Sequence, residues 1–247
     1  MRFRAALTLD GYVDCWGPAN CTLPGSLQLT SSPTRYLDIA VAVGGVFTDI
    51  ACVYGVTEAG FAVSLSSKCQ QQFAWLSTSL IPFGDPAQPI EQLTLTDGAL
   101  CVRTVDHFVF CAGLNNIGES FPFFDSAHPP QYLSIALFAS QDPFMLYAVR
   151  PDGVLVLLSL NAPLTAEPPT PVETPVFPAG HTVSTISVGA LFGCALVDQQ
   201  SGVWCFQSQA QPARDVRITS WPIFPLCNQR EVGTPCFRAV SVASSVY

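Results

Sequence analysis

Cysteines are the residues of this chain whose type and spacing bear most directly on chemistry, and there are 10 of them in 247 residues. Cys101 and Cys111 flank one predicted hairpin, and Cys194 and Cys205 flank another. The odd-length turn at 105–107 sets Cys101 directly opposite Cys111, and opposed Cα atoms at ~4.5–5.5 Å suit a disulfide. Cys194 and Cys205 are one residue further apart, so a looser turn must correct the register. We therefore predict one disulfide within each hairpin.

The other six cysteines allow several pairings, which their spacing leaves open. The pairs that close most easily are Cys227 with Cys236, Cys15 with Cys21 and, as the remainder, Cys52 with Cys69. A structural metal site would need four convergent ligands, usually with a CxxC spacing, and the sequence has no such spacing. We predict neither a metal nor a cofactor.

Histidines and carboxylates give little support to catalysis. His107, His128 and His181 lie in separate segments without a nucleophile motif such as G-x-S-x-G. A glycoside hydrolase would need two carboxylates facing each other across the sugar. Asp85 and Asp142 each precede a proline, which is an ordinary turn pair, and the strands expected to be innermost are apolar with Ser and Thr. We expect a protein that is not an enzyme.

The composition limits which classes of partner the chain is expected to bind and which compartment it is expected to occupy. The formal net charge is -8 with only 10 Lys and Arg, which opposes binding to nucleic acid. No uninterrupted apolar run is long enough for membrane insertion, which needs ~18 residues or more. The cysteines and the acceptor pattern Asn20-Cys21-Thr22 predict an extracellular or cell-surface protein of the secretory pathway with a glycan on Asn20. MRFRAALTL is too short for a secretory signal, so either a signal has been removed or the chain is a piece of a longer protein.

A unit of about 47 residues recurs along the chain. Hairpin segments start at residues 5, 52, 101, 147 and 194, separated by 47, 49, 46 and 47 residues. Asp10-Gly11 and Asp152-Gly153 supply the residues that primed hairpin turns require. Each hairpin after the first follows another predicted strand, and these strands begin at Leu37, Glu91, Leu133 and Ser184. Repetition at this period is typical of β-sheets arranged around an axis.

The two ends of the sequence complement each other. The first repeat lacks a leading strand, and the closing AVSVASSVY matches one. Together the two ends make one complete repeat, as expected for a closed ring of sheets without an open edge. The alternative is that both ends are arbitrary cuts in a longer array of repeats. We therefore predict an all-β fold, a β-propeller of about five blades closed by pairing of the N- and C-terminal strands. The single predicted domain spans 1–247, with repeats at about 1–35 plus 237–247, 36–89, 90–131, 132–182 and 183–236.

Two segments resemble a known repeat. Residues 186–206 read ISVGALFGCALVDQQSGVWCF, and residues 6–20 read ALTLDGYVDCWGPAN. Both resemble the repeat of the regulator of chromosome condensation superfamily, which also includes propeller-type beta-lactamase inhibitors. The matching positions are Ile186, Ser187, Gly189, Cys194, Ala195, Leu196, Val203, Trp204 and Cys205, then Asp10, Gly11, Val13, Cys15, Trp16, Gly17 and Asn20, then Cys111, Gly113 and Asn115. The cysteine-bearing form is similar to the extracellular branch, including crinkly-type receptor ectodomains. The family usually has seven blades, so five is a departure. The resemblance implies that loops on one face make the contacts.

Two aromatic loops are the candidate binding segments. They span 120–132 and 220–237, and their prolines would reduce the entropy lost on docking. The candidate anchors are Phe121, Phe123, Phe124, Tyr132, Trp221 and Phe224. The alternative is that these residues fold back over the sheet edges. Residues 161–180, rich in Pro and Thr, are predicted to form an extended connector.

The function predicted from the sequence is a non-enzymatic extracellular binding or assembly module. It would contact a protein or a glycan of unknown identity through loops on a propeller face, alone or as part of a larger surface assembly. The alternatives are a secreted inhibitor of an enzyme and, less favoured, a five-bladed glycoside hydrolase, which rests on fold analogy alone.

Overall fold

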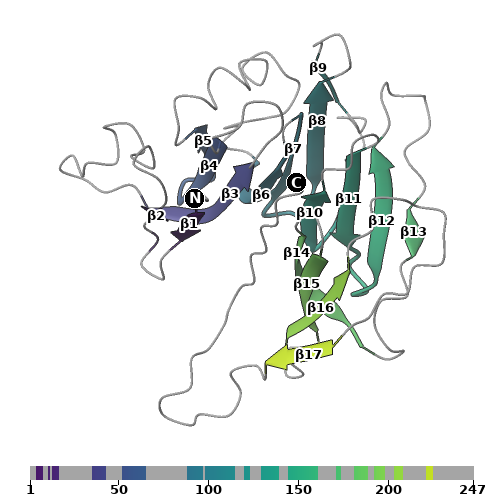
Figure 1. Cartoon of the computed structure of the whole chain (residues 1–247). Helices are drawn as coiled ribbons and strands as arrows, with labels where there is room; N and C mark the ends of the chain where they lie inside the picture. Colours follow the sequence, from purple (N-terminus) through teal and green to yellow (C-terminus); the bar gives the residue numbers. More distant parts are fainter. Residues whose placement is uncertain are drawn as a thin grey trace. The chain divides into compact units, whose positions relative to one another are not determined.

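The computed structural model contains only β-strands as regular elements among the residues that it describes (Figure 1). The described residues are 4–7, 11, 13–16, 35–42, 52–64, 88–96, 98–114, 120–122, 129–138, 144–160, 171–173, 181–188, 192–197, 203–207 and 221–224. Asn20 and the predicted closing strand at 238–246 lie outside them, as do Cys21, Cys69, Cys227, Cys236, Phe123 and Phe124. The described part of the chain is therefore all-β.

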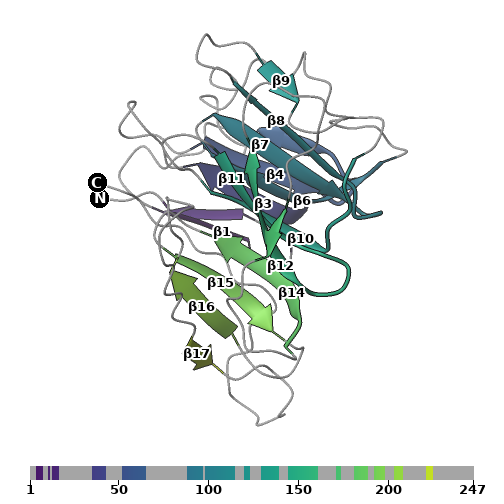
Figure 2. The ribbon, with the colours of Figure 1, turned by 90° about the vertical axis from the view of Figure 1, so that its right-hand side faces the viewer.

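Among the described residues the strands form five antiparallel sheets, and within each sheet the strand order follows the sequence. The first two sheets are β1(Arg4–Leu7) with β2(Val13–Trp16), and β3(Tyr36–Ala42), β4(Cys52–Thr57) and β5(Ala62–Ser64). The third is β6(Ile90–Leu95), β7(Ala99–Thr104), β8(Val109–Leu114) and β9(Ser120–Pro122). The fourth is β10(Ser134–Phe138), β11(Phe144–Val149), β12(Leu155–Leu160) and β13(Val172–Glu173). The fifth is β14(Val183–Val188), β15(Phe192–Val197), β16(Val203–Gln207) and β17(Trp221–Phe224), visible as a green-to-yellow series in Figure 2. Successive meanders of this kind are the blades of a β-propeller, which confirms the predicted fold class.

The chain divides into two compact units, and each is described by itself. The first, residues 1–130 with 162–168, contains the sheets from β1 to β9. The second, residues 131–161 with 169–247, contains the sheets from β10 to β17. In the first unit β3 contacts β6, and in the second β10 contacts β14, so consecutive sheets meet through their first strands.

Four tight turns share one backbone feature. Gly11, Gly60 and Gly153 have φ of 82°, 79° and 80°, and His107 occupies the corresponding place with φ of 67°. These residues lie in the turns β1–β2, β4–β5, β11–β12 and β7–β8, respectively. Primed hairpin turns require positive φ. Glycine adopts it without steric penalty. We refer to the end of each sheet that carries this hairpin turn as its turn end.

Each of the three turn glycines is also bonded to the next sheet. The amides of Tyr36, Ile90 and Val183 donate to the carbonyls of Gly11, Gly60 and Gly153 at 2.7, 2.9 and 2.9 Å, respectively. A Cβ at Gly60 would lie 2.4 Å from Pro89 Cβ, and a Cβ at Gly153 would lie 2.7 Å from Thr182 Cβ. The repeat therefore requires glycine here for the close approach of the next sheet as well as for the turn.

The outer strands differ from the sequence prediction. Three segments predicted as loop or connector contribute β9, β13 and β17, which pair with β8, β12 and β16. Pro122 lies in β9, and Pro222 in β17 is opposite Trp204. Proline removes a backbone donor, so it is tolerated in strands mainly at sheet edges. The proline content that indicated loops instead marks edge strands.

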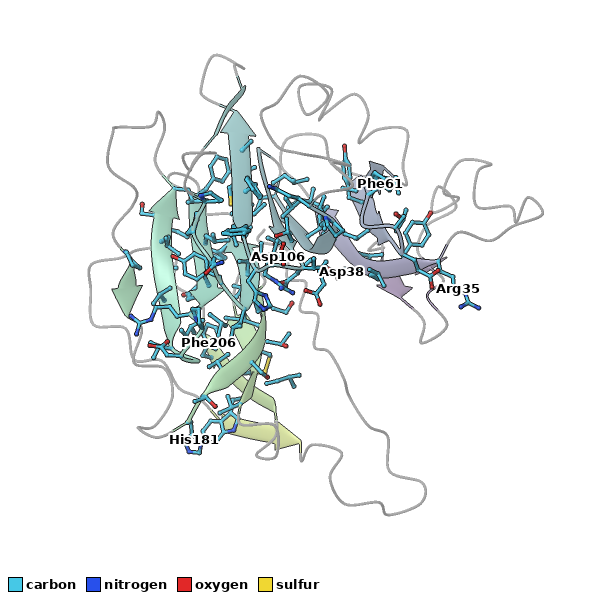
Figure 3. The ribbon with its side chains drawn as sticks, turned by 180° about the vertical axis from the view of Figure 1, so that it is seen from behind. Arg35, Asp38, Phe61, Asp106, His181 and Phe206 are labelled. Atoms are coloured by element: carbon cyan, nitrogen blue, oxygen red, sulfur yellow. A yellow bond between two sulfur atoms is a disulfide. The ribbon has the colours of Figure 1, made fainter. Side chains whose placement is uncertain are left out.

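Each unit has its own apolar core. In the first, Val56, Ile90, Leu100 and Val102 are among the fully buried members of one cluster. In the second, the Phe206 ring lies 5.6 Å from that of Tyr147 and belongs to a cluster with Val149 and Ile186. Figure 3 labels Phe206 within this group of side chains. The alternation of strand residues between two faces supplies these clusters.

Candidate functional site

Three large apolar side chains are exposed at turn ends of the first unit. Leu37, Phe61 and Val105 are 49%, 37% and 45% exposed, and they are the exposed large hydrophobic residues among those the structure describes. Leu37 lies at the start of β3, beside the turn between β4 and β5 that precedes Phe61. Val105 lies in the turn between β7 and β8. Exposed apolar groups that gather at one end of a fold indicate an interaction surface.

Backbone hydrogen bonds tie the turns that carry Phe61 and Val105 to the segment 89–90. Ile90 N donates to Gly60 O at 2.9 Å, and Val105 N donates to Pro89 O at 3.0 Å. The turn before Phe61 and the turn at Val105 therefore flank the same short segment, 89–90. We name Leu37, Phe61, Val105 and the turns at 58–61 and 105–107 the turn-end surface.

Charged side chains surround the apolar groups. Arg35, which projects from the start of β3 in Figure 3, lies 3.9 Å from Glu58, and both side chains are exposed. Exposed ion pairs of this kind add little stability to the fold. Asp106 is also exposed. The turn-end surface is thus apolar with a mixed charged rim, which is the usual composition of a protein interface.

A buried arginine fixes the turn at 105–107. Arg103 is 7% exposed, and its Nη1 lies 2.9 Å from Glu91 Oε2 and 2.8 Å from His107 Nδ1. Its Nε donates to Gln92 Oε1 at 3.2 Å. Because a guanidinium only donates, Nδ1 of His107 is the acceptor in this hydrogen bond. Arg103 therefore connects the turn to the strand β6.

Asp38 joins the second sheet to the third. Its Oδ2 accepts the Leu93 amide and its Oδ1 accepts the Ile39 amide, both at 2.9 Å. Burial raises the pKa of Asp38 to about 7, although the two amides and the Arg103 charge act in the opposite direction. The nearby Glu91 charge raises this pKa further. Figure 3 labels Asp38 at the side of the first unit where β3 runs.

Ser134 makes the equivalent bond in the second unit. Its Oγ accepts the Ile186 amide at 3.2 Å, so a side chain of β10 holds the first strand of the next sheet as Asp38 does. Sequence reasoning missed both residues. The signal was present, because the strings YLDIA at 36–40 and YLSIA at 132–136 place Asp38 and Ser134 at the same position.

The structure contains both hairpin disulfides that the cysteine spacing predicts. Cys101 is directly opposite Cys111, with Cα atoms 4.1 Å apart and a disulfide between them. Cys194 is directly opposite Cys205, with Cα atoms 4.0 Å apart and a disulfide. Each bond joins the second strand to the third within one sheet. Cys15 and Cys52 lie in β2 and β4.

Of the predicted aromatic anchors, the structure describes the side chain of Tyr132 and the backbone of Phe121, Trp221 and Phe224. Tyr132 is only 7% exposed, so the prediction that it anchors a partner is wrong. Its position corresponds to Tyr36, which is also buried at the start of a sheet. Phe121 belongs to β9, and Trp221 and Phe224 belong to β17, which places their backbone in edge strands rather than loops.

The remaining chemistry-bearing residues are separated. The His181 ring is 5.7 Å from the Trp204 ring, in a packing contact of the second unit, whereas His107 belongs to the Arg103 network. Within the described ranges, no cluster of three or more His, Cys, Asp or Glu residues is arranged to hold a metal ion. No helix with the length and apolarity to cross a membrane occurs in the part of the chain that the structure describes.

Comparisons with known proteins give structural likeness without sequence similarity. No protein-family model and no curated protein matches the sequence. Human WBSCR16 is similar with a TM-score of 0.47 and 12% identity, over 72% of this chain and 49% of that one. The CRINKLY WD40 ectodomain of the Arabidopsis thaliana receptor kinase ACR4 gives 0.43 and 14%, over 83% and 65%. Prp20p from Saccharomyces cerevisiae gives 0.33 and 12%, over 82% and 67%. The chain thus spans about half of the first structure and just under two thirds of the second.

Proposed function

We propose that the chain is a non-enzymatic extracellular module that binds a protein partner through the turn-end surface. The observation that carries this proposal is the exposure of Leu37 at the start of β3 and of Phe61 and Val105 in adjoining turns. Transfer of a large apolar side chain out of water gains roughly 1.5–3 kcal/mol when it is complete. Because these side chains are about half exposed, each offers a part of that gain on docking.

The backbone beneath the turn-end surface is held firmly. Arg103 is bonded to Glu91 and His107, and the turn at 58–61 is bonded to the next sheet at Ile90. A surface that is ordered before docking loses less conformational entropy when a partner binds. The fixed turns therefore support a binding role for this end of the sheets.

The extracellular setting is supported by the cysteines. The disulfides Cys101–Cys111 and Cys194–Cys205 would persist in an oxidising compartment and would be reduced in the cytosol. The sequon at Asn20 and the resemblance to crinkly-type ectodomains, both drawn from the sequence, agree with this setting. From the sequence we also propose that the module can bind a glycan and can form part of a larger surface assembly.

A capture experiment with matched variants tests the binding role. The purified chain is immobilised, and proteins retained from the extracellular fraction of the native source are identified and quantified. The variant Leu37→Ser, Phe61→Ser, Val105→Ser should lose the specific partner by at least about tenfold, because the apolar contribution is removed. A control with Gln131→Ser and Thr182→Ser, which are exposed in the second unit, should retain it. Equal retention by both variants would place the binding surface elsewhere.

A further inference from the structure

Three hairpin turns close with the same pair of backbone hydrogen bonds, so their residues can be compared position by position. In the turns at 57–61, 104–108 and 150–154, the amide of the first residue donates to the carbonyl of the fifth at 2.9 Å. The amide of the fourth residue donates to the carbonyl of the first at 2.8, 2.9 and 2.9 Å, respectively. The fourth residue has positive φ in each turn, as Gly60, His107 and Gly153. Asp106 and Asp152 therefore occupy the same position, the third of the turn.

In the second unit, the aspartate at this position binds an arginine of its own turn. Arg150 is the first residue of the turn, and its Nε donates to Asp152 Oδ1 at 3.1 Å. Its Nη2 donates to Oδ2 of the same carboxylate. A pair of parallel hydrogen bonds between a guanidinium and a carboxylate adds geometric specificity as well as energy. An aspartate at the third position of this turn is therefore well placed to bind a guanidinium.

In the first unit, no arginine of the chain binds Asp106 in this way. The residue at the place of Arg150 is Thr104, which is buried and uncharged. Arg103, the residue before it, is also buried and already pairs with Glu91 at 2.9 Å. Asp106, labelled in Figure 3, is exposed, and within the described part of the chain its carboxylate has neither a hydrogen-bond nor an ion-pair partner.

The other exposed carboxylates that the structure describes each lie beside an arginine. The pairs are Glu58 with Arg35 at 3.9 Å, Glu91 with Arg103 at 2.9 Å, and Asp152 with Arg150. A solvated carboxylate needs no partner for stability, but Asp106 lies in an arginine-binding turn and next to the exposed Val105. This part of the turn-end surface is therefore complementary to a cation that lies beside an apolar side chain.

The turn that carries Asp106 is held in place before any docking. The Val105 amide donates to Pro89 O at 3.0 Å, and His107 Nδ1 accepts a 2.8 Å hydrogen bond from the buried Arg103. His107 adopts its positive φ of 67° although it carries a Cβ, which costs free energy, and its ring is bonded beneath the turn. Because the turn is ordered by these contacts, little conformational entropy is lost when a partner binds.

We propose that Asp106 and Val105 receive an arginine and an adjacent apolar side chain of the partner protein, with the guanidinium on Asp106 as Arg150 lies on Asp152. The proposal rests on the binding role of the turn-end surface and specifies the partner chemistry that this surface selects. A second copy of this chain is a poor candidate for the partner, because each copy has a formal net charge of -8 and like charges repel.

Peptide titration of the full, oxidised chain, followed by NMR at the amides of residues 105–107, tests the arginine directly. The probe is the acetylated and amidated peptide Gly-Leu-Arg-Leu-Gly. One control peptide replaces arginine with citrulline, which keeps the shape without the charge, and another uses lysine, which keeps the charge without the fork. The arginine peptide should bind about threefold to fivefold more tightly than the citrulline peptide, as expected for an exposed ion pair, and more tightly than the lysine peptide. Binding no tighter than that of either control would overturn the proposal.

Matched variants assign the arginine preference to one carboxylate. Asp106→Asn keeps a hydrogen-bond acceptor but loses the charge, so the arginine peptide should bind it no better than the citrulline peptide does. Asp152→Asn makes the same change at the same turn position in the second unit and should leave the preference intact. A preference for arginine that survives in Asp106→Asn would overturn the proposal.

The capture experiment on native extracellular material separates this proposal from the binding role itself. Asp106→Asn should retain the partner about threefold to fivefold less well than the parent does. Full retention by Asp106→Asn, with loss in the variant Leu37→Ser, Phe61→Ser, Val105→Ser, would overturn the arginine assignment and leave the binding role intact. Full retention by both variants would contradict the binding role as well.

Discussion

The backbone carbonyl of Gly153 accepts a 2.9 Å hydrogen bond from the amide of Val183, which begins the following sheet. Gly60 and Ile90 repeat this relationship at 2.9 Å in the first unit. One glycine therefore serves the hairpin turn of its own sheet and the junction with the next. A substitution of this glycine should therefore weaken the hairpin turn and the junction with the next sheet together.

Gly153→Ala should destabilise the second unit by about 1–3 kcal/mol. An alanine at φ of 80° is strained, and its Cβ would lie 2.7 Å from Thr182 Cβ. Urea unfolding followed by fluorescence measures the change. Gly153→Asn tolerates positive φ better and isolates the contact with Thr182. An unchanged midpoint for Gly153→Ala would show that the turn is not held in this geometry.

Gly193→Ala should be destabilising because of one neighbour. A Cβ there would lie 2.4 Å from Cζ of Phe206, a ring that is fully buried. Overpacking of this kind typically costs about 1–3 kcal/mol. Phe206→Leu would be destabilising by itself, yet the double variant should be more stable than the sum of the two single effects predicts. Strict additivity in a double-mutant cycle would contradict the packing described here.

Arg103→Lys should lower the free energy of unfolding by roughly 1–2 kcal/mol although it preserves charge. A lysine cannot bond Gln92, Glu91 and His107 together in the fork geometry of a guanidinium. Arg150→Lys is the matched control, because Arg150 pairs with Asp152 in an exposed turn and should change stability by less than about 0.5 kcal/mol. Similar effects for both substitutions would refute the role assigned to Arg103.

Loss of either hairpin disulfide should lower stability by about 2–3 kcal/mol, the loop entropy for separations of 10 and 11 residues. The paired substitution Cys101→Ala with Cys111→Ala, and the same for Cys194 and Cys205, tests each bond without exposing a lone thiol. Peptide mapping without reduction should recover both pairs from the parent. Free thiols at these positions in native material would contradict the assignment.

The hairpins could be predicted because their signals are local. Asp10-Gly11 and Asp152-Gly153 predict turns, and both glycines have positive φ in the structure. The opposition of Cys101 and Cys111 follows from counting residues across one turn. Such features depend on residues within about a dozen positions of one another, where propensity and register decide the outcome.

The outer strands and the junction residues could not be predicted in the same way. Pro222 in β17 belongs to an edge strand, where the missing amide carries no penalty, so its proline signal was ambiguous. Asp38 accepts an amide 55 residues away, at Leu93, and the YLDIA string marks the position of Asp38 without indicating this distant partner. Tyr132 was taken for a loop anchor, although its alignment with Tyr36 in the YLxIA strings indicates a buried strand start.

Site-specific photo-crosslinking tests the binding role of the turn-end surface most directly. A photoreactive amino acid replaces Phe61 or Val105 in one pair of variants, and Gln131 or Pro171, which are exposed in the second unit, in a control pair. The chain is then illuminated in extracellular material from its native source. We expect the same discrete partner band from Phe61 and Val105, competed by unlabelled chain, and no such band from the control positions. Crosslinks that form equally at all four positions, or only at the control positions, would contradict the account.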